Sequence, residues 1–394
     1  MHAHGSAAQD AGVTLANWQT DPYVRWSFQH VDQIVRTTAI RAAAPGPLPE
    51  APVDLEDVAV PQSDGTSLPL SWVMEATDTD GWAVYRHGRL IAERYYGEMD
   101  RGARHLLMSV SKSLIGMVVG VLVDGGVVDP GRPVEHYVPA LAGRGYGGAT
   151  VRHLLDMRSG IEFSEDYLDP SAEVRVMEQV IGWAPRTRPD LPVTLYDFLA
   201  RLGRKSAHGG AFEYRSCETN MLGWVCEAAT ATPMTQLMSE LLWTPMGAEH
   251  DAYIGVDAAG TGMYDGGVCA ALRDLVRFGA LLLEGGASLG GERVVSQRWL
   301  DDTWRGGEDS VAAFAASPTV TLMPGGMYRN QCWFPAPHRD VLLCLGIHGQ
   351  MVYVNRASGV VAAKLSSWPE PQHAWKLFAT VDAFDAVSRA LAEL

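Results

Sequence analysis

Cysteine is scarce in this sequence and occurs in no paired pattern. The 394 residues contain five cysteines, an odd number, and no two of them are separated by two residues. Disulfide scaffolds and Cys-x-x-Cys zinc or redox sites rely on such pairs. We therefore expect reduced, buried thiols at Cys217, Cys226, Cys269, Cys332 and Cys344.

The sequence also lacks a hydrophobic run long enough to cross a membrane. Its most apolar segment, Leu114 to Val123, is bracketed by Lys112 and Asp124 and falls well short of the roughly 20 residues that a bilayer requires. Residues 1–20 contain no basic start followed by an apolar stretch, so they do not resemble a signal peptide. We expect a cytoplasmic protein with no membrane partner.

Positive charge is in deficit. The chain has 31 Lys and Arg against 46 Asp and Glu, a formal net charge of −15. Nucleic-acid binding needs a positive face that displaces counterions from phosphates, so no nucleic-acid partner is expected. Hydrophobic residues make up 47% of the chain and charged residues 20%, which is typical of a soluble globular protein.

The apolar pattern predicts strands towards both ends of the chain and helices between them. A hairpin is expected over residues 82–96, where Gly88 supplies the turn, and a central helix over residues 109–124. Further helices are expected over residues 31–44, 151–157, 194–203, 220–229, 271–284 and 375–391, and further strands over residues 341–347, 351–355 and 360–365.

This order of elements favours an α/β fold. We expect residues 1–108 and 286–394 to form a discontinuous α/β domain and residues 109–285 a mainly α-helical domain inserted into it. The functional cleft would lie between the two.

The strongest chemical signal is Ser109-Val110-Ser111-Lys112 at the start of the central helix. Residues three apart share a helix face, so the Lys112 amine would touch the Ser109 hydroxyl. A buried lysine loses proton affinity and can take the serine proton as the oxygen attacks a carbonyl. The alternative is an ordinary helix entry, with Ser109 as N-cap and Lys112 solvated. The chain has only four lysines, and this one opens a helix too apolar for a solvated face, which favours catalysis.

Two weaker signals follow along the chain. Tyr214 lies just before a predicted helix, and a tyrosine near the lysine could protonate the leaving group, although most tyrosines are core residues. Gly346 lies on a predicted late strand, where a glycine lets substrate approach the backbone and the next N–H can complete an oxyanion hole. A plain β-bulge is the alternative reading of this glycine.

Three further patterns give less information about function. No histidines have metal-site spacing such as His-Glu-x-x-His, so we expect a site without a metal or other cofactor. Residues 286–290 match the nucleophile-elbow string Gly-x-Ser-x-Gly, but they follow a predicted helix and are expected to be a loop. Gly116 and Gly120 are expected to allow close packing of the central helix.

Ser109-x-x-Lys112, Tyr214-x-Ser216 and a glycine on a late strand, in this order, resemble the penicillin-recognising serine hydrolases of the class C β-lactamase type. The strings at residues 104–114, 165–167, 346–350 and 364–369 resemble the nylon-oligomer hydrolases in particular. The resemblance extends from about residue 82 to the C-terminus. It implies a β-lactamase-like fold, in which an antiparallel sheet is flanked by helices and carries an inserted α-helical domain.

The resemblance also implies a role for individual residues. Ser109 would be the nucleophile, Lys112 its activator and Tyr214 the proton relay, while the backbone N–H groups of Ser109 and Ile347 would form the oxyanion hole. The implied substrate-binding residues are Tyr167, Glu178, Trp183, Asp265, Trp333 and Gly346. Tyr167 would contact the scissile amide and Glu178 would bind a free amine of the substrate. Asp265 would form a wall of the cleft, and a simple turn aspartate is an equal alternative for it.

The implied function is a serine hydrolase that cleaves short linear amides with a free amine, such as 6-aminohexanoate dimer, through an acyl-enzyme on Ser109. One alternative is a carboxylesterase acting on short acyl esters, because esters demand less protonation of the leaving group. Another is a sensor module that is acylated but never turns over. The sequence leaves open whether the chain forms a homodimer.

The sequence departs from these families at several positions. Ser216 stands where β-lactamases have Asn, and Cys344-Leu345-Gly346 replaces their Lys-Thr-Gly, which removes the cation that binds a β-lactam carboxylate. Glu178 replaces the Asp of nylon-oligomer hydrolases with strong amide activity, and Lys376 lies near the position of their cleft histidine. We therefore do not expect antibiotic hydrolysis as the main activity.

Overall fold

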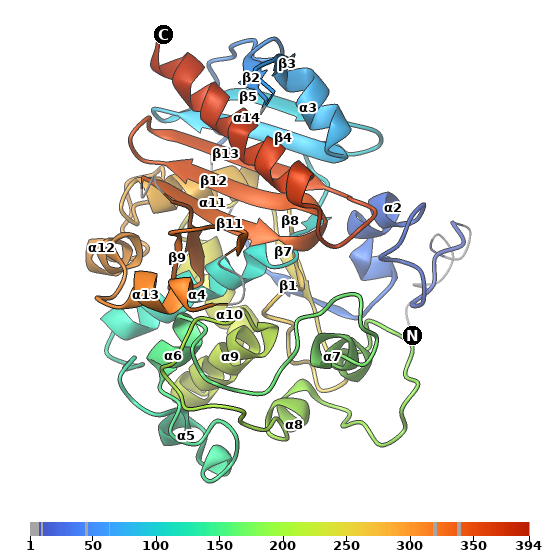
Figure 1. Cartoon of the computed structure of the whole chain (residues 1–394), viewed down its shortest axis with the longest axis vertical. Coiled ribbons are helices and arrows are strands. Elements are labelled where there is room, and N and C mark those ends of the chain that lie inside the picture. The colour runs from blue at the N-terminus through green and yellow to red at the C-terminus, as the bar shows by residue number, and fades with distance from the viewer. Residues whose placement is uncertain are drawn as a thin grey trace.

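A seven-stranded antiparallel sheet is the largest sheet of the fold (Figure 1). The computed structural model describes residues 8, 11–43, 46–62, 64–317, 321–336 and 340–393. Within these residues the strand order is β5-β4-β13-β12-β11-β10-β9. The strands are β4 (Thr79–Arg86), β5 (Arg89–Tyr95), β9 (Met327–Arg329), β10 (Cys332–Phe334), β11 (Val341–Gly346), β12 (Gln350–Asn355) and β13 (Val360–Ser366). Because β4 pairs with β13, strands from distant parts of the chain share one sheet.

The predicted hairpin is confirmed and has a two-residue turn. β4 and β5 pair up to Arg86 and Arg89, and the turn residues His87 and Gly88 have φ angles of 50° and 79°. Positive φ at both central residues matches the right-handed twist of the strands, and glycine adopts it at little cost. The predicted late strands are also confirmed, as β11, β12 and β13.

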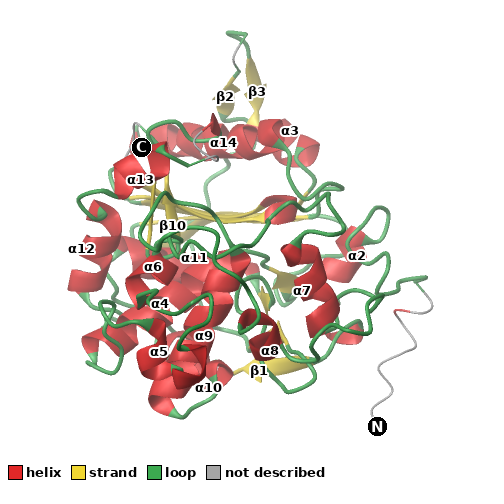
Figure 2. Ribbon diagram, turned by 60° about the horizontal axis from the view of Figure 1, so that its bottom comes forward, coloured by secondary structure: helices red, strands yellow, loops and turns green. Residues whose placement is uncertain are grey.

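Helices cover both faces of this sheet (Figure 2). α3 (Leu70–Ala76) and α14 (Ala374–Ala392) lie on one face, and α11 (Leu272–Leu283) packs on the other against β4, β12 and β13. Gly279 permits this close approach, since a Cβ there would lie 2.3 Å from Val361 Cγ1. α11 thus packs on the sheet, although its residues lie within the range 109–285 that was expected to form the helical domain.

A second antiparallel sheet has the strand order β1-β7-β8-β6. Its strands are β1 (Thr37–Ile40), β7 (Ala252–Gly255), β8 (Val268–Ala270) and β6 (His105–Leu106), and a separate hairpin is formed by β2 (Ala59–Pro61) and β3 (Ser67–Pro69). The predicted helix over residues 31–44 is wrong for the described residues 31–43, where only η1 (Val31–Gln33) is helical and β1 follows it, while residue 44 lies outside the described residues. β1 is a strand because it pairs along its whole length with β7, a partner far away in the sequence.

In Figure 1 the helices labelled α5 to α10 lie in the lower part of the molecule. The helices other than α3, α11 and α14 are mostly short. They are α2 (Val24–Phe28), α4 (Val110–Asp124), α5 (Val134–Tyr137), η2 (Pro139–Leu141), α6 (Val151–Leu155), α7 (Glu173–Ile181), α8 (Leu195–Leu199), α9 (Ser216–Thr230), α10 (Met234–Met238), the π-helical turn η3 (Ser239–Trp243), α12 (Gln297–Arg305), α13 (Ser310–Ala315) and η5 (Ile347–Gly349). The remaining predicted helices correspond to α4, α6, α8, α9, α11 and α14, with bounds that differ by one to four residues. No helix of the described residues is long and apolar enough to cross a membrane.

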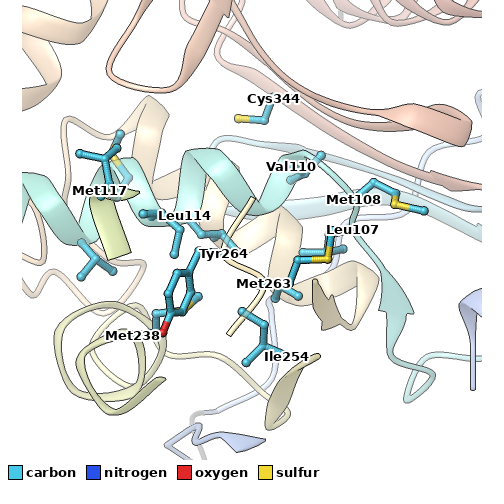
Figure 3. Close-up of a cluster of buried hydrophobic side chains, with 14 of the residues drawn as sticks. Leu107, Met108, Val110, Leu114, Met117, Met238, Ile254, Met263, Tyr264 and Cys344 are labelled. Atoms are coloured by element: carbon cyan, nitrogen blue, oxygen red, sulfur yellow. The ribbon is translucent and has the colours of Figure 1, made fainter. Parts of the chain in front are cut away.

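α4 is the central helix of the core. Every residue from Val110 to Gly120 is buried, and Figure 3 shows apolar side chains such as Leu114 and Met263 around its first turns. Gly116 and Gly120 allow close packing, as expected, since a Cβ would lie 2.5 Å from Asn330 O at the first position and 2.5 Å from Trp299 Nε1 at the second. All five cysteines are free and buried, which confirms that expectation.

Candidate active site

Ser109 lies at the junction between the small sheet and the central helix. β6 pairs with β8, Leu107 N donates to Val268 O, and Ser109 immediately precedes α4. Met108, between them, has a φ of 45°, a conformation that costs free energy for a residue with a side chain. The Ser109 side chain makes no N-cap hydrogen bond, so the simple helix-cap alternative does not describe it.

Lys112 is buried beneath Ser109 with its amine fully engaged. Its Nζ donates to Ser109 Oγ at 2.8 Å, to Ser216 Oγ at 3.1 Å and to the main-chain oxygen of Asp265 at 2.8 Å. The side chain is 1% exposed. The predicted contact between serine and lysine is therefore present, and three acceptors orient the amine.

The charge state of Lys112 differs from the expectation based on burial alone. Burial lowers the pKa of Lys112, but the negative groups around it, Tyr214 when ionised, Asp265 and Glu165, more than offset this, and the pKa is raised. The carboxylates of Asp265 and Glu165 therefore favour the ammonium form of Lys112. This form must lose a proton before it can accept the one on Ser109.

Tyr214 packs against both Lys112 and Trp333. The Lys112 Nζ lies 5.0 Å from the centre of its ring, and the Trp333 ring centre lies 5.1 Å away on a tilted plane. Burial raises the pKa of Tyr214, while the charge of Lys112 and hydrogen bonds with Ser109 and Lys112 partly offset the increase. The phenol is therefore protonated at rest and can donate to a leaving group.

The end of β11 leads into Ile347, one of the two residues expected to form the oxyanion hole. Gly346 closes the strand, and a Cβ there would lie 2.6 Å from Leu107 O, so a side chain would collide with the segment that leads to Ser109. Gln350 holds the turn that follows, since its Nε2 donates to Ser366 O at 2.7 Å and to His348 O at 3.1 Å. This arrangement brings Ile347 and Ser109 to the same cavity.

The cavity has a volume of about 800 Å³ and is lined by both sheet and helical elements. Of the sequence-predicted site residues it is lined by Ser109, Tyr167, Tyr214, Trp333, Gly346 and Ile347. Its ionisable lining residues, besides the tyrosines, are Glu162, Glu165, Glu173, Glu213, Lys205 and His373. Lys205 is itself paired with Glu213 at 2.5 Å. The wall is therefore predominantly acidic.

A model of the family described as Beta-lactamase matches residues 73–382. The chain belongs to the β-lactamase family. It is also 39% identical over 368 residues to the 6-aminohexanoate-dimer hydrolase of Paenarthrobacter ureafaciens, covering 93% of this chain and 91% of that protein. The chain is thus a hydrolase of the β-lactamase family and a homologue of that enzyme, as the sequence motifs indicated.

Solved structures confirm the β-lactamase fold. A candidate 6-aminohexanoate-dimer hydrolase from Bacillus anthracis is 25% identical and superposes with a TM-score of 0.90, covering 98% of each chain. A family VIII carboxylesterase, 17% identical, has a TM-score of 0.61 over 81% of this chain and 96% of that chain. At 17% identity, the similarity to the carboxylesterase shows the shared fold alone, not a shared activity.

Three of the implied substrate-binding residues do not line the cavity. Trp183 is 1% exposed and packs edge-on against Trp18, 5.1 Å between ring centres, so it lies in the core. Glu178 is buried and paired with Arg175. The expectations that Trp183 lines the cleft and that Glu178 presents a free carboxylate there are not met in this structure.

Asp265, the third, lies behind Lys112 and not in a wall of the cleft. Its Oδ1 accepts a hydrogen bond from Asn220 Nδ2 at 2.8 Å, and its main-chain oxygen holds the lysine amine. Its Oδ2 is 3.8 Å from Lys112 Nζ. Asp265 is therefore a turn residue and a partner of the lysine, and it does not line the cavity as the cleft-wall interpretation expected.

Two residues near the reacting groups were not assigned a role from the sequence. Glu165 accepts hydrogen bonds from Ser216 and from Tyr167, and Gln350 secures the oxyanion turn. Both lie in strings that resemble the nylon-oligomer hydrolases, and this was the only signal for them. The lysine at the expected histidine position, Lys376, pairs with Asp78, while His373 lines the cavity.

Proposed function

We propose that the chain is a serine hydrolase that cleaves short linear amides bearing a free amine, such as 6-aminohexanoate dimer, through an acyl-enzyme on Ser109. The observation that carries the proposal is the 2.8 Å hydrogen bond from Lys112 Nζ to Ser109 Oγ at the wall of the cavity. The similarity to 6-aminohexanoate-dimer hydrolase over most of the chain supports the substrate class.

The proposed reaction has two halves. Ser109 Oγ attacks the amide carbonyl as neutral Lys112 takes its proton, and the oxyanion is stabilised by the backbone N–H groups of Ser109 and Ile347. Tyr214 protonates the leaving amine and recovers a proton from Lys112. Water then attacks the acyl-enzyme, with Lys112 and Tyr214 removing its proton, and the acid is released.

The acidic wall supports selection of a cationic substrate end. Glu173 lines the cavity, accepts a hydrogen bond from Ser164 N at 2.8 Å, and forms no ion pair within the described residues. Glu162 is exposed at the same wall. An ammonium group held by such a carboxylate gains a charge-assisted hydrogen bond. We propose that Glu173 takes the role expected of Glu178, whose charge is already balanced by Arg175.

A carboxylesterase acting on short acyl esters is the second candidate. The pairing of Glu178 with Arg175 favours it, since the carboxylate expected to bind an amine is neutralised. The same nucleophile, lysine and oxyanion hole would serve both activities. A sensor that is acylated without turnover uses these groups too and differs in the release of product.

We further propose that the protein acts in the cytoplasm on a small molecule, without a nucleic-acid partner. Five free cysteines suit a reducing compartment, and a net charge of −15 disfavours a phosphate backbone. A homodimer remains part of the proposal, and sedimentation equilibrium would measure the mass of the assembly.

Product release from linear 6-aminohexanoate dimer, with a p-nitrophenyl ester run in parallel, tests the function. Ser109→Ala and Lys112→Ala should each lower turnover of both substrates by about 1,000-fold or more while the fold is retained. Cleavage of the ester alone would establish the carboxylesterase. A stable acyl adduct in intact-protein mass spectrometry, without product, would establish the sensor, and substantial activity of Ser109→Ala would refute the site.

A further inference from the structure

Glu165 makes three hydrogen bonds next to the catalytic lysine. Its Oε1 accepts from Ser216 Oγ at 2.5 Å and from Tyr167 OH at 2.6 Å, and its Oε2 accepts from Ser216 N at 2.9 Å. The side chain is half-buried and borders the same cavity as Ser109. No arginine or lysine of the described residues forms an ion pair with it. Its charge is therefore balanced only by groups reached through these bonds.

The hydrogen bonds have one direction. Lys112 Nζ donates to Ser216 Oγ at 3.1 Å, and Ser216 Oγ donates its own hydrogen to Glu165 Oε1. A hydroxyl that accepts on one side and donates on the other can pass a proton along without moving its oxygen. Ser216 thus connects an ammonium donor to a carboxylate acceptor.

We propose that Glu165 stores the proton that Lys112 must lose before it can activate Ser109, and that Ser216 passes this proton on. The inference rests on the proposed function and deepens it. One N–H bond of Lys112 breaks as a bond to Ser216 Oγ forms, and the original Ser216 proton moves to Glu165 Oε1. The products are a neutral amine and a neutral carboxylic acid, so the net charge of the group is unchanged.

The neutral amine then acts through both halves of the reaction. It accepts the Ser109 proton during attack, returns a proton for the leaving group, and repeats this exchange with water and with Ser109 during deacylation. The reverse transfer through Ser216 restores the resting ion pair. Glu165 does not touch the reacting atoms and is a positioning residue that sets the protonation state of Lys112.

The neighbouring ionisable groups make this path preferable to the alternatives. Lys112 faces Tyr214, Asp265 and Glu165, and the two carboxylates favour its ammonium form while Tyr214 is a neutral phenol. Tyr214 cannot take the Lys112 proton at rest, because burial raises the pKa of its phenol and the phenol oxygen already carries a proton. Burial also raises the pKa of Glu165, although the charge of Lys112 and hydrogen bonds from Ser216 and Tyr167 oppose the increase. The raised pKa of the carboxyl group reduces the pKa difference between Lys112 and Glu165, which sets the free energy of the proton transfer.

The pH dependence of Ser109 reactivity shows whether Glu165 accepts the lysine proton or only supports the structure of the site. In the wild type the resting and reactive forms hold the same number of protons, so the rate should be flat around neutral pH. In Glu165→Gln the lysine must lose its proton to solvent, so the rate should rise with pH. Loss of the Glu165 charge also lowers the pKa of Lys112, so the labelling rate of the variant should recover within the pH range of the experiment.

The experiment measures the rate at which a fluorophosphonate labels Ser109, by intact-protein mass spectrometry from about pH 5.5 to 9.5. This probe needs an activated serine and no amide turnover, so the inference can hold even if the dimer is not a substrate. Glu165→Gln should label about 100-fold more slowly than wild type at pH 6, and the deficit should shrink by about tenfold per pH unit.

Three variants complete the test. Ser216→Ala breaks the path while keeping Glu165 and should show the same rise with pH, whereas Ser216→Thr keeps a hydroxyl and should restore a flat profile. Asp166→Asn removes a charge at the next, exposed residue and should match wild type. A deficit in Glu165→Gln or Ser216→Ala that is constant across pH would overturn the proposal, as would the absence of any deficit. Failure of the wild type to label at any pH would overturn both this inference and the serine mechanism.

Discussion

Arg175 and Glu178 form an ion pair on one face of α7. Arg175 Nη1 lies 2.8 Å from one carboxylate oxygen of Glu178 and 3.0 Å from the other. Arg175 Nε also donates to Tyr167 O at 2.9 Å. The pair therefore supports the loop that carries Tyr167 and leaves Glu178 no free charge to offer a ligand.

Glu178→Gln should consequently have no selective effect on amine-bearing substrates. We expect kcat/KM for 6-aminohexanoyl-p-nitroanilide and for hexanoyl-p-nitroanilide to fall by the same factor, because the lost contact is with Arg175. Their ratio should stay within about twofold of wild type, which is less than one charge-assisted hydrogen bond would change it. A loss confined to the amine-bearing anilide would restore Glu178 as the partner of the amine.

Glu173→Gln is the matched change within the cavity wall. Removal of this carboxylate should raise KM for the amine-bearing anilide by about tenfold and leave the neutral anilide unchanged, because one charge-assisted hydrogen bond is lost. Competition by hexylamine against each variant provides an independent readout. If hexylamine inhibits wild type and Glu173→Gln equally, Glu173 does not bind the amine.

The Asp265 side chain should contribute to stability through its hydrogen bond with Asn220. Asp265→Ala leaves the buried Asn220 amide without an acceptor at that position and should lower the free energy of unfolding by about 1–3 kcal/mol. Asp265→Asn retains an acceptor and should be less destabilised. Urea unfolding of both variants measures this, and equal stability of Asp265→Ala and wild type would contradict the assignment.

Gln350→Ala should loosen the oxyanion turn. The carbonyl groups of His348 and Ser366 lose their shared donor, so the N–H of Ile347 is held less firmly. We expect kcat on a p-nitrophenyl ester to fall by about 10-fold to 100-fold with little change in KM, since the lost stabilisation belongs to the transition state. Gln236→Ala, on an exposed helix surface, is the control. A change confined to KM would mean that Gln350 serves substrate binding.

Lys364 should make stability depend on pH. It is buried on β13 with its Nζ 3.1 Å from Thr77 O, and burial lowers its pKa to about 7. Below that pH the folded and unfolded chains both carry the charge, and its burial cost is fully present. Above it the unfolded chain binds more protons until its own pKa near 10.5, so stability should rise with pH by up to about 1.4 kcal/mol per unit.

Lys364→Met isolates this contribution. The variant should be at least as stable as wild type at pH 6, because no charge is buried, and it should lose the rise between pH 7 and 10. Lys205→Met, which removes a partly exposed lysine, should keep the wild-type slope. Identical slopes for Lys364→Met and wild type in urea unfolding would show that Lys364 is not the titrating group.

Local elements were predictable because their causes lie close together in the sequence. The contact between Ser109 and Lys112 needs only a helix, whose three-residue spacing brings them together. The hairpin needs only Gly88 and its flanking strands. The misplaced helix over residues 31–44 shows the limit, because β1 owes its conformation to pairing with β7.

The roles of the acidic residues were not predictable in this way. Glu178 was expected to bind an amine. In the structure it is paired with Arg175 and does not line the cavity. Asp265 was placed in the cleft wall and lies behind Lys112. A carboxylate takes its role from the charges and donors that surround it, and these come from separate elements of the fold.

The sequence by itself determined the contact between Ser109 and Lys112, the family and the main strands and helices, because short-range spacing and long matching strings carry that information. Only the tertiary structure decided that carboxylates raise the pKa of Lys112, that Ser216 connects it to Glu165, and that Glu173 and not Glu178 lines the cavity. These properties depend on burial and on electrostatic interactions between residues that are distant in the chain. Such interactions exist only once the chain has folded.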